Sequence, residues 1–260
     1  MTLSPRAHRH GVAALFVLSG ASGLVFEIIW VRQLGHWVGH STVAVSLVVA
    51  AFLAGLVLGA WWGGARADRD PAPLRRYSLL ELATGLGALA VSLALSQLPA
   101  LLLALPAPPP GWLRHALGFV LLLGPTSLMG ATLPTLARHV VRDPRRAGRP
   151  FATLYAVNTL GAALGCGLGG FVLLGRYGLL RTALAASLLN VVVAALAWAL
   201  HRTAAPSEAP DDPPGIAATA HTDARPSDRM RLAAIAAVTG FAAIACEVLW
   251  FRVLHAFVRS

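Results

Sequence analysis

The residues with the clearest capacity for chemistry lie inside an apolar stretch near the N-terminus. Glu27, Trp30 and Arg32 belong to the segment 20–32, which is otherwise almost entirely hydrophobic. A charged side chain at the centre of a bilayer costs about 2.5–3.5 kcal/mol on insertion scales, so it usually has a partner or a function. Glu27 could bind a proton or a cation facing the interior, or it could form a hydrogen bond that fixes two helices. Arg32 lies five positions after Glu27, a spacing that is more compatible with Arg32 reaching the membrane surface than with an ideal pair.

The same pattern returns near the C-terminus, 220 positions later (247 − 27 = 220). A glycine, a glutamate, a tryptophan and an arginine recur at identical spacing, the second set being Gly240, Glu247, Trp250 and Arg252. An internal repeat of this kind indicates a duplicated unit. We therefore expect one complete membrane module followed by the beginning of a second, with Glu247 and Arg252 as further binding candidates.

Two other groups of polar residues are candidates. Tyr155 and Asn158 fall within an apolar segment and either line a pathway or form polar contacts between helices. Asp68 and Arg69 follow the second apolar segment and could form a conformational loop, although charges in such a loop also act simply as a topology signal.

Composition decides the class of protein that must position these residues. The chain is 57% hydrophobic and 12% charged, and several apolar runs exceed the 18 residues that a transmembrane helix needs. The net charge of +10 comes from arginine alone and lies mainly in loops between apolar segments, which argues against nucleic acid as a partner. Since the sequence shows no zinc spacing, phosphate loop or dinucleotide fingerprint, we expect no catalytic residue, no metal site and no cofactor in this chain.

The expected fold is all-α and polytopic. Residues 1–201 form a first six-helix module, 202–230 a disordered cytoplasmic linker rich in Pro, Ala, Asp and Ser, and 231–260 the first helix of a second, incomplete module. The six helices are expected at about 11–38, 41–64, 78–105, 113–141, 151–174 and 179–201.

Local signals refine these helices. Glycines at four-residue spacing predict close helix contacts in the second and fifth helices, at positions 55, 59 and 63 and at positions 161, 165 and 169. Pro125 and Pro134 predict a kink or a break in the fourth helix. The sequence from Ser78 to Glu81 matches a capping box, which favours a helix start at Ser78 with Glu81 as a cap.

Arginines give the expected orientation. Fifteen lie in the N-terminal tail, the loops after the second and fourth helices and the linker, against three in the opposite loops. Because cytoplasmic loops of membrane proteins carry an excess of positive charge, the N-terminus is expected in the cytoplasm.

Four stretches, 18–32, 51–59, 125–134 and 154–165, resemble the membrane region of bacterial fused MFS-like (major-facilitator-like)/spermidine synthase proteins. In that family the membrane region accompanies an aminopropyltransferase domain that uses decarboxylated S-adenosylmethionine and putrescine. The resemblance implies a location in the bacterial inner membrane. This chain contains no such domain, so the expectation is a fragment or one part of a split protein, and the reaction is not placed in it.

Two functions follow as expectations. The first is an integral membrane module of a spermidine-synthase-like protein of polyamine biosynthesis, acting as a membrane platform or carrier. The alternative is one half of an MFS-like secondary transporter for a cationic small molecule. The expected partners are the lipid bilayer, a polyamine or other cationic small molecule, and either an aminopropyltransferase domain or a second membrane half.

Overall fold

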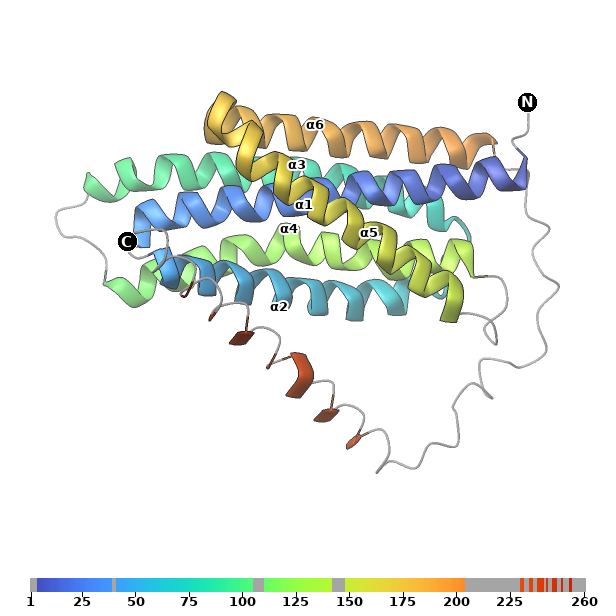
Figure 1. The fold of residues 1–260 in the computed structure, drawn as a ribbon, viewed down its shortest axis with the longest axis horizontal. Coiled ribbons are helices and arrows are strands. Elements are labelled where there is room, and N and C mark those ends of the chain that lie inside the picture. Colours follow the sequence, from blue (N-terminus) through green and yellow to red (C-terminus); the bar gives the residue numbers. More distant parts are fainter. Residues whose placement is uncertain are drawn as a thin grey trace. The chain divides into compact units, whose positions relative to one another are not determined.

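The computed structural model describes residues 4–38, 41–104, 110–141 and 148–203, together with isolated positions between 230 and 253. Its helices are α1 (Pro5–Val38), α2 (Ser41–Ala67), α3 (Pro73–Leu103), α4 (Gly111–Val140), α5 (Gly148–Leu168), the π-helical turn η2 (Gly169–Leu173) and α6 (Leu174–Thr203) (Figure 1). The chain divides into two units, 1–203 and 204–260. The linker 204–229 and the repeated residues Glu247, Trp250 and Arg252 lie outside the described residues.

The described helices confirm an all-helical protein with membrane-spanning segments. Five stretches are long and apolar enough to cross a membrane, and the fifth runs from Gly148 to Thr203. This last stretch contains both α5 and α6. The helical backbone is interrupted within α6 at Gly178, whose φ of 72° and ψ of −178° are not helical. Figure 1 shows that the chain turns back between α5 and α6. A positive φ suits glycine, which has no Cβ.

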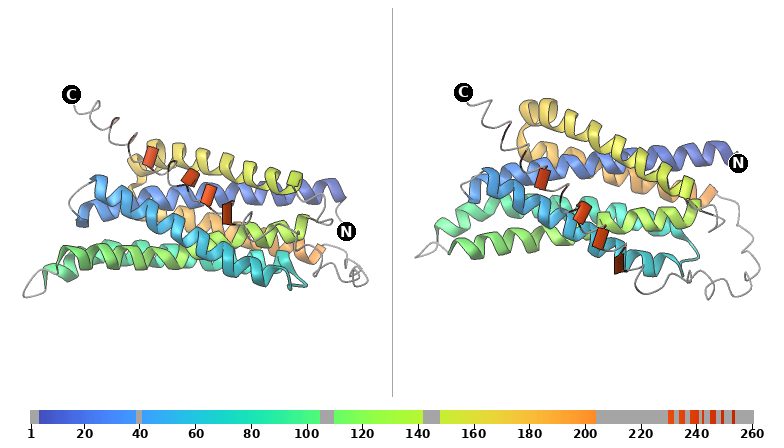
Figure 2. Two further views of the ribbon diagram at one scale, coloured as in Figure 1. Left: turned by 90° about the horizontal axis from the view of Figure 1, so that it is seen from below. Right: turned by 60° about the horizontal axis from the view of Figure 1, so that its bottom comes forward.

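The helices of the first unit do not pack mainly in chain order. The most extensive pairings are α2 with α4, α1 with α5 and α3 with α6, and α1 also contacts α6 as α3 contacts α4. If α1, α2 and α3 are exchanged with α4, α5 and α6 in that order, each of these pairings becomes another pairing of the same set. Figure 2 shows the arrangement from two further directions, with α5 beside α1.

The two glycine stripes confirm the predicted close contacts. A Cβ built on Gly161 or Gly165 of α5 would lie 1.9 or 2.1 Å from a backbone carbonyl oxygen of α1. On α2, a Cβ at Gly59 would lie 1.9 Å from the carbonyl oxygen of Ser127 on α4. Glycine is therefore required at these positions because the two backbones touch.

Helix α4 departs from the prediction of a break. It runs as one helix from Gly111 to Val140 through both Pro125 and Pro134. A threonine follows each proline, and its hydroxyl donates to the carbonyl oxygen four residues earlier, from Thr126 to Leu122 and from Thr135 to Ala131. Hydroxyl groups and neighbouring helices commonly support proline within membrane helices.

Two apolar clusters fill the bundle. The larger one is built around α1 and α2 and contains Phe26 stacked on Trp30, with 5.6 Å between the ring centroids. The smaller one lies toward the beginning of α1 and α3 and contains Phe16 packed edge-on against Tyr77. Between these side chains the bundle also buries a set of polar groups, which form the candidate site.

Candidate functional site

A buried carboxyl group on α3 is the most unusual feature of the described residues. Glu81 is 1% exposed and accepts a hydrogen bond of 2.6 Å from the hydroxyl of Ser19 on α1. The phenol of Tyr77, one turn earlier on α3, also faces this carboxyl group. Glu81 follows the start of α3 by eight residues, which places it about 12 Å along the helix.

The capping-box prediction for this segment is therefore wrong. Helix α3 begins at Pro73, five residues before the expected start, so Ser78 and Glu81 lie in its second and third turns. The hydroxyl of Ser78 donates to the carbonyl oxygen of Ala194 on α6 at 2.7 Å. The capping signature is local, and here contacts with two other helices use both side chains instead.

A second set of polar side chains joins α6 to α1 and to α3. The hydroxyl of Ser22 lies within hydrogen-bond distance of the Asn190 amide and of the Ser19 carbonyl oxygen, and the hydroxyl of Ser187 donates to the carbonyl oxygen of Gly85 at 2.9 Å. Together these groups form what we call the polar centre, which comprises Ser19, Ser22, Tyr77, Glu81, Ser187 and Asn190.

The amide of Asn190 has one orientation that satisfies more groups than the other. A serine hydroxyl has one proton, so Ser22 cannot donate fully to both Ser19 and the Asn190 oxygen. In that arrangement the Asn190 nitrogen also has no partner among the described residues. If the amide nitrogen instead donates to Ser22, the Ser22 hydroxyl can donate to the Ser19 carbonyl oxygen. This assignment makes Asn190 a donor to the centre.

Trp30 lies farther along the same α1–α3 interface, toward the C-terminal ends of both helices. It is fully buried, and its indole N–H donates to the hydroxyl of Ser92 at 3.0 Å. Gln33 donates to the backbone of Ser92 at 2.8 Å. The pairs Ser19–Glu81 and Trp30–Ser92 are both 62 positions apart, which shows that α1 and α3 run parallel and in constant register.

The structure places Glu27 and Arg32 away from the polar centre. Glu27 is half-buried and interacts with neighbouring groups, whereas Arg32 is exposed. Gly23, one turn before Glu27, approaches Met129 of α4. Because residues four apart share one face of a helix, Glu27 lies on the side of α1 that faces α4.

Asn158 and Tyr155 lie in different surroundings on α5. Asn158 is half-buried, and its backbone oxygen would lie 2.2 Å from a Cβ at Gly20, so it packs closely on α1. Tyr155 is 60% exposed on α5. Gly20 precedes Glu27 by seven residues, about 10 Å along α1, so Asn158 and Glu27 occupy different levels of the bundle.

The loop between α2 and α3 contains an ion pair, but it does not join the two expected residues. Asp68 and Arg69 are both exposed. The ion pair connects Asp70 to Arg76 on α3 with an O···N distance of 3.0 Å, and Arg76 also donates to the carbonyl oxygen of Arg66. In the described part of the chain, no group of three or more His, Cys, Asp or Glu side chains could hold a metal ion.

The sequence contained a signal for the polar centre that reasoning from single motifs missed. On α3, the buried positions Tyr77, Glu81, Thr84 and Ser92 follow helical spacing and form a polar stripe in an apolar helix. On α1, Ser19, Ser22, Trp30 and Gln33 form a similar stripe. Matching two polar stripes of the same spacing would have paired α1 with α3.

Comparison with curated proteins finds a polyamine aminopropyltransferase from Corynebacterium efficiens that is 33% identical over 183 residues. The match covers 68% of this chain, and the chain spans about one third of that protein's length. No protein-family model matches the sequence. No solved structure matches it either. Over most of its length, the chain is thus similar to one part of a polyamine aminopropyltransferase.

Proposed function

We propose that this chain is the membrane module of a polyamine-aminopropyltransferase-like protein and that it acts as a carrier with a proton site at Glu81. The observation that carries the proposal is the burial of this carboxyl group between α1, α3 and α6. A membrane platform needs no ionisable group in its interior, and such groups are costly in apolar surroundings. Similarity to the Corynebacterium aminopropyltransferase supports the connection with polyamines.

The packing around Glu81 suits a proton better than an amine. Its carboxyl group already accepts from Ser19 at 2.6 Å and adjoins Tyr77, which is fully buried. A polyamine could reach it only after α1, α3 and α6 separate. A proton needs no such space and can pass between oxygen atoms at hydrogen-bond distance.

Glu27 is the better candidate for the cationic molecule itself. It is half-buried, and it lies on the α4 side of α1 instead of inside the polar centre. The proposed carrier therefore has two carboxyl groups with separate tasks, with Glu81 exchanging a proton and Glu27 binding a cationic small molecule.

The test uses the full chain in liposomes with an imposed pH gradient and radiolabelled putrescine or spermidine. We expect uptake by the wild type, loss of the pH-dependent part with Glu81→Gln, and loss of binding with Glu27→Gln. Ser96→Ala, which removes an exposed hydroxyl that bonds within α3, should leave uptake unchanged. Thermal unfolding of each variant shows whether the fold is intact.

The carrier proposal fails if both glutamine variants fold and transport as the wild type does, or if the wild type takes up neither amine. Loss of folded protein in Glu27→Gln would instead assign Glu27 a structural role. If no amine is transported but the chain recruits an aminopropyltransferase domain to membranes, its function is that of a platform.

A second candidate is one half of an MFS-like secondary transporter for a cationic small molecule. The observation that favours it is the exchange of α1–α3 with α4–α6, which preserves the helix contacts. Inverted repeats of this kind are common in secondary transporters. Co-purification of the chain with a second six-helix polypeptide would support it, whereas co-purification with an aminopropyltransferase supports the first proposal.

We further propose that the module lies in the bacterial inner membrane with its N-terminus in the cytoplasm, as the arginine distribution predicts. Reporter fusions test the orientation. A fluorescent protein that folds only in the cytoplasm should be active when fused before residue 4 or after residue 203. Alkaline phosphatase fused within the loop between α3 and α4 should be active outside.

A further inference from the structure

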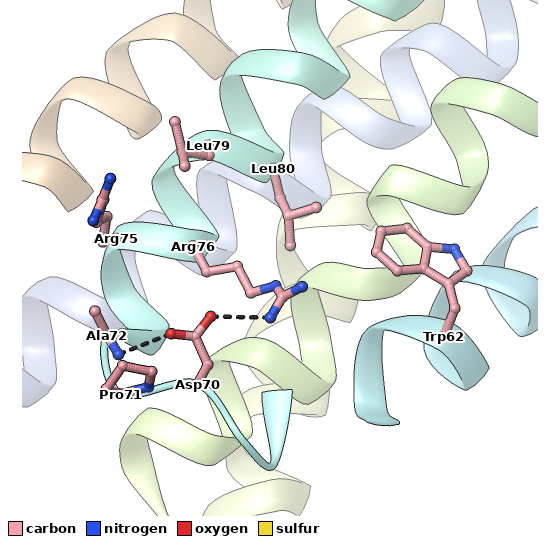
Figure 3. A pocket seen from close by; sticks show the side chains of 8 residues that line it. All are labelled: Trp62, Asp70, Pro71, Ala72, Arg75, Arg76, Leu79 and Leu80. Carbon is pink, nitrogen blue, oxygen red and sulfur yellow. Dashed lines mark hydrogen bonds and ion pairs between the residues drawn. The ribbon is translucent and has the colours of Figure 1, made fainter. Parts of the chain in front are cut away.

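A pocket at the end of α2 and the beginning of α3 is lined by both charged and apolar side chains. Its volume is about 490 Å³, and the lining includes Trp62, Asp70, Arg75, Arg76, Leu79 and Leu80 (Figure 3). Figure 3 shows Arg76 extending from α3 toward Trp62 of α2, with Asp70 beside it and Leu80 above it. Cationic and apolar side chains therefore face the same space.

The depth of this pocket matches the boundary of a membrane. The apolar span on α2 ends at Ala67, and the span on α3 begins at Pro73. Leu79 is six residues, about 9 Å, into the α3 span and is 51% exposed. The polar part of the pocket is thus at the end of the spans, and its apolar wall continues into them.

The charge of the loop favours an anionic ligand. Residues 66–76 contain four arginines and two aspartates. The ion pair with Asp70 and the bond to the Arg66 carbonyl oxygen are both made by Nη1 of Arg76. A guanidinium group has five N–H donors, so Arg76 can bind an oxyanion through its other nitrogens and keep both contacts.

Aromatic rings hold other arginines of this region near the helices. The guanidinium carbon of Arg75 lies 5.8 Å from the ring centroid of Trp198 on α6, and that of Arg66 lies 5.4 Å from Trp62. These contacts limit the freedom of long side chains that would otherwise extend into solvent. Arginines held in this way lose less conformational entropy when they bind a phosphate.

We propose that this pocket binds the phosphate headgroup of an anionic glycerophospholipid, with one acyl chain along Leu79 and Trp62. A soluble phosphate would use only the arginines, whereas a lipid uses both the cationic and the apolar wall. This inference is independent of the carrier function, because it concerns neither Glu27 nor the polar centre.

The test measures thermal unfolding of the full chain in detergent as short-chain phosphatidylglycerol is added, with phosphatidylcholine and glycerol phosphate in parallel. We expect stabilisation by phosphatidylglycerol alone. Arg75→Gln should weaken its apparent affinity about fivefold, since each basic residue near an anionic lipid surface contributes about 1 kcal/mol. Arg75→Lys keeps the charge and should retain most of the affinity.

Arg149→Gln is the matched control, because Arg149 is exposed in the first turn of α5 and does not line the pocket. The proposal is overturned if phosphatidylcholine stabilises the protein equally, if glycerol phosphate reproduces the effect, or if Arg149→Gln weakens binding as much as Arg75→Gln does. If Arg75→Gln does not fold, equal affinity of Arg75→Lys and the wild type supports the proposal, and loss of affinity in Arg75→Lys contradicts a role for charge.

Discussion

The α1–α5 and α1–α3 interfaces join the same helix to different neighbours by different means. At the first, Gly161 and Gly165 bring two backbones into direct contact. At the second, the hydroxyl and indole groups of Ser19 and Trp30 bond to side chains 62 positions away. One face of α1 is therefore held by close packing, and another by hydrogen bonds.

This difference separates a face of α1 that contributes only packing from a face that contacts an ionisable group. Close packing between backbones has no ionisable group and changes little with the surroundings. The polar interface contains Glu81, which can gain or lose a proton, so its contacts with Ser19 and Tyr77 can change without any change of sequence. The carrier proposed above would need a part that stays fixed and a part that responds, and the two faces of α1 would supply them.

The largest expected effect comes from filling the glycine interface. Gly161→Ala places a Cβ 1.9 Å from the carbonyl oxygen of Val17, so α1 and α5 must move apart. We expect a loss of about 1–3 kcal/mol in the free energy of unfolding, as for other overpacked sites. Denaturant unfolding in detergent measures it.

Gly167→Ala on the same helix is the control, because a Cβ there meets nothing within 4 Å. Any gain in helix propensity is common to both alanine variants, so their difference isolates the packing. Equal stability of the two variants would show that α1 and α5 do not touch in this way.

A smaller effect should follow from breaking the polar interface at Glu81. Ser19→Ala removes a 2.6 Å hydrogen bond and leaves a buried carboxyl oxygen with one donor fewer. The expected cost is about 1–2 kcal/mol in the free energy of unfolding. Ser96→Ala removes a hydroxyl that is exposed and bonds within α3, so it should cost little. If the two serine variants are equally stable, the Ser19–Glu81 bond does not hold α1 to α3.

The smallest effect is expected at the contact between Trp30 and Ser92 in the α1–α3 interface. Trp30→Phe keeps most of the apolar area but removes the N–H that donates to Ser92. Hydrogen bonds between membrane helices average about 0.6 kcal/mol, and we expect a loss of that size. Trp112→Phe, at a position 70% exposed, serves as the reference in the same unfolding measurement. A loss of several kcal/mol would mean that ring packing dominates.

The glycine contacts could be predicted from the sequence because their signal is local and has one physical reading. Four-residue spacing places glycines on one face of a helix, and only another helix can fill the space that they leave. Even so, the spacing did not indicate which helix would fill it. The pairing of α2 with α4 and of α1 with α5 depends on the whole bundle.

The polar centre was harder to predict, because local patterns and tertiary contacts competed for the same residues. Ser78 and Glu81 match a capping box, yet they bond to α6 and α1. Asn190 lies in a largely apolar segment, and the side chain that bonds to it, Ser22, comes from a distant helix. The expected binding roles of Glu27, Tyr155 and Asn158 stay predictions, as do those of Glu247 and Arg252 in the second copy.

The pairing of helices that are distant in the chain has a consequence for biosynthesis. A ribosome delivers α2 before α4, and α1 well before α5, so each early helix enters the membrane without its main neighbour. Until residues 148–168 have been synthesised, lipid tails or chaperones must cover the face of α1 that α5 later contacts. Insertion of this module is therefore expected to be sequential, whereas its assembly waits for the last two helices, α5 and α6.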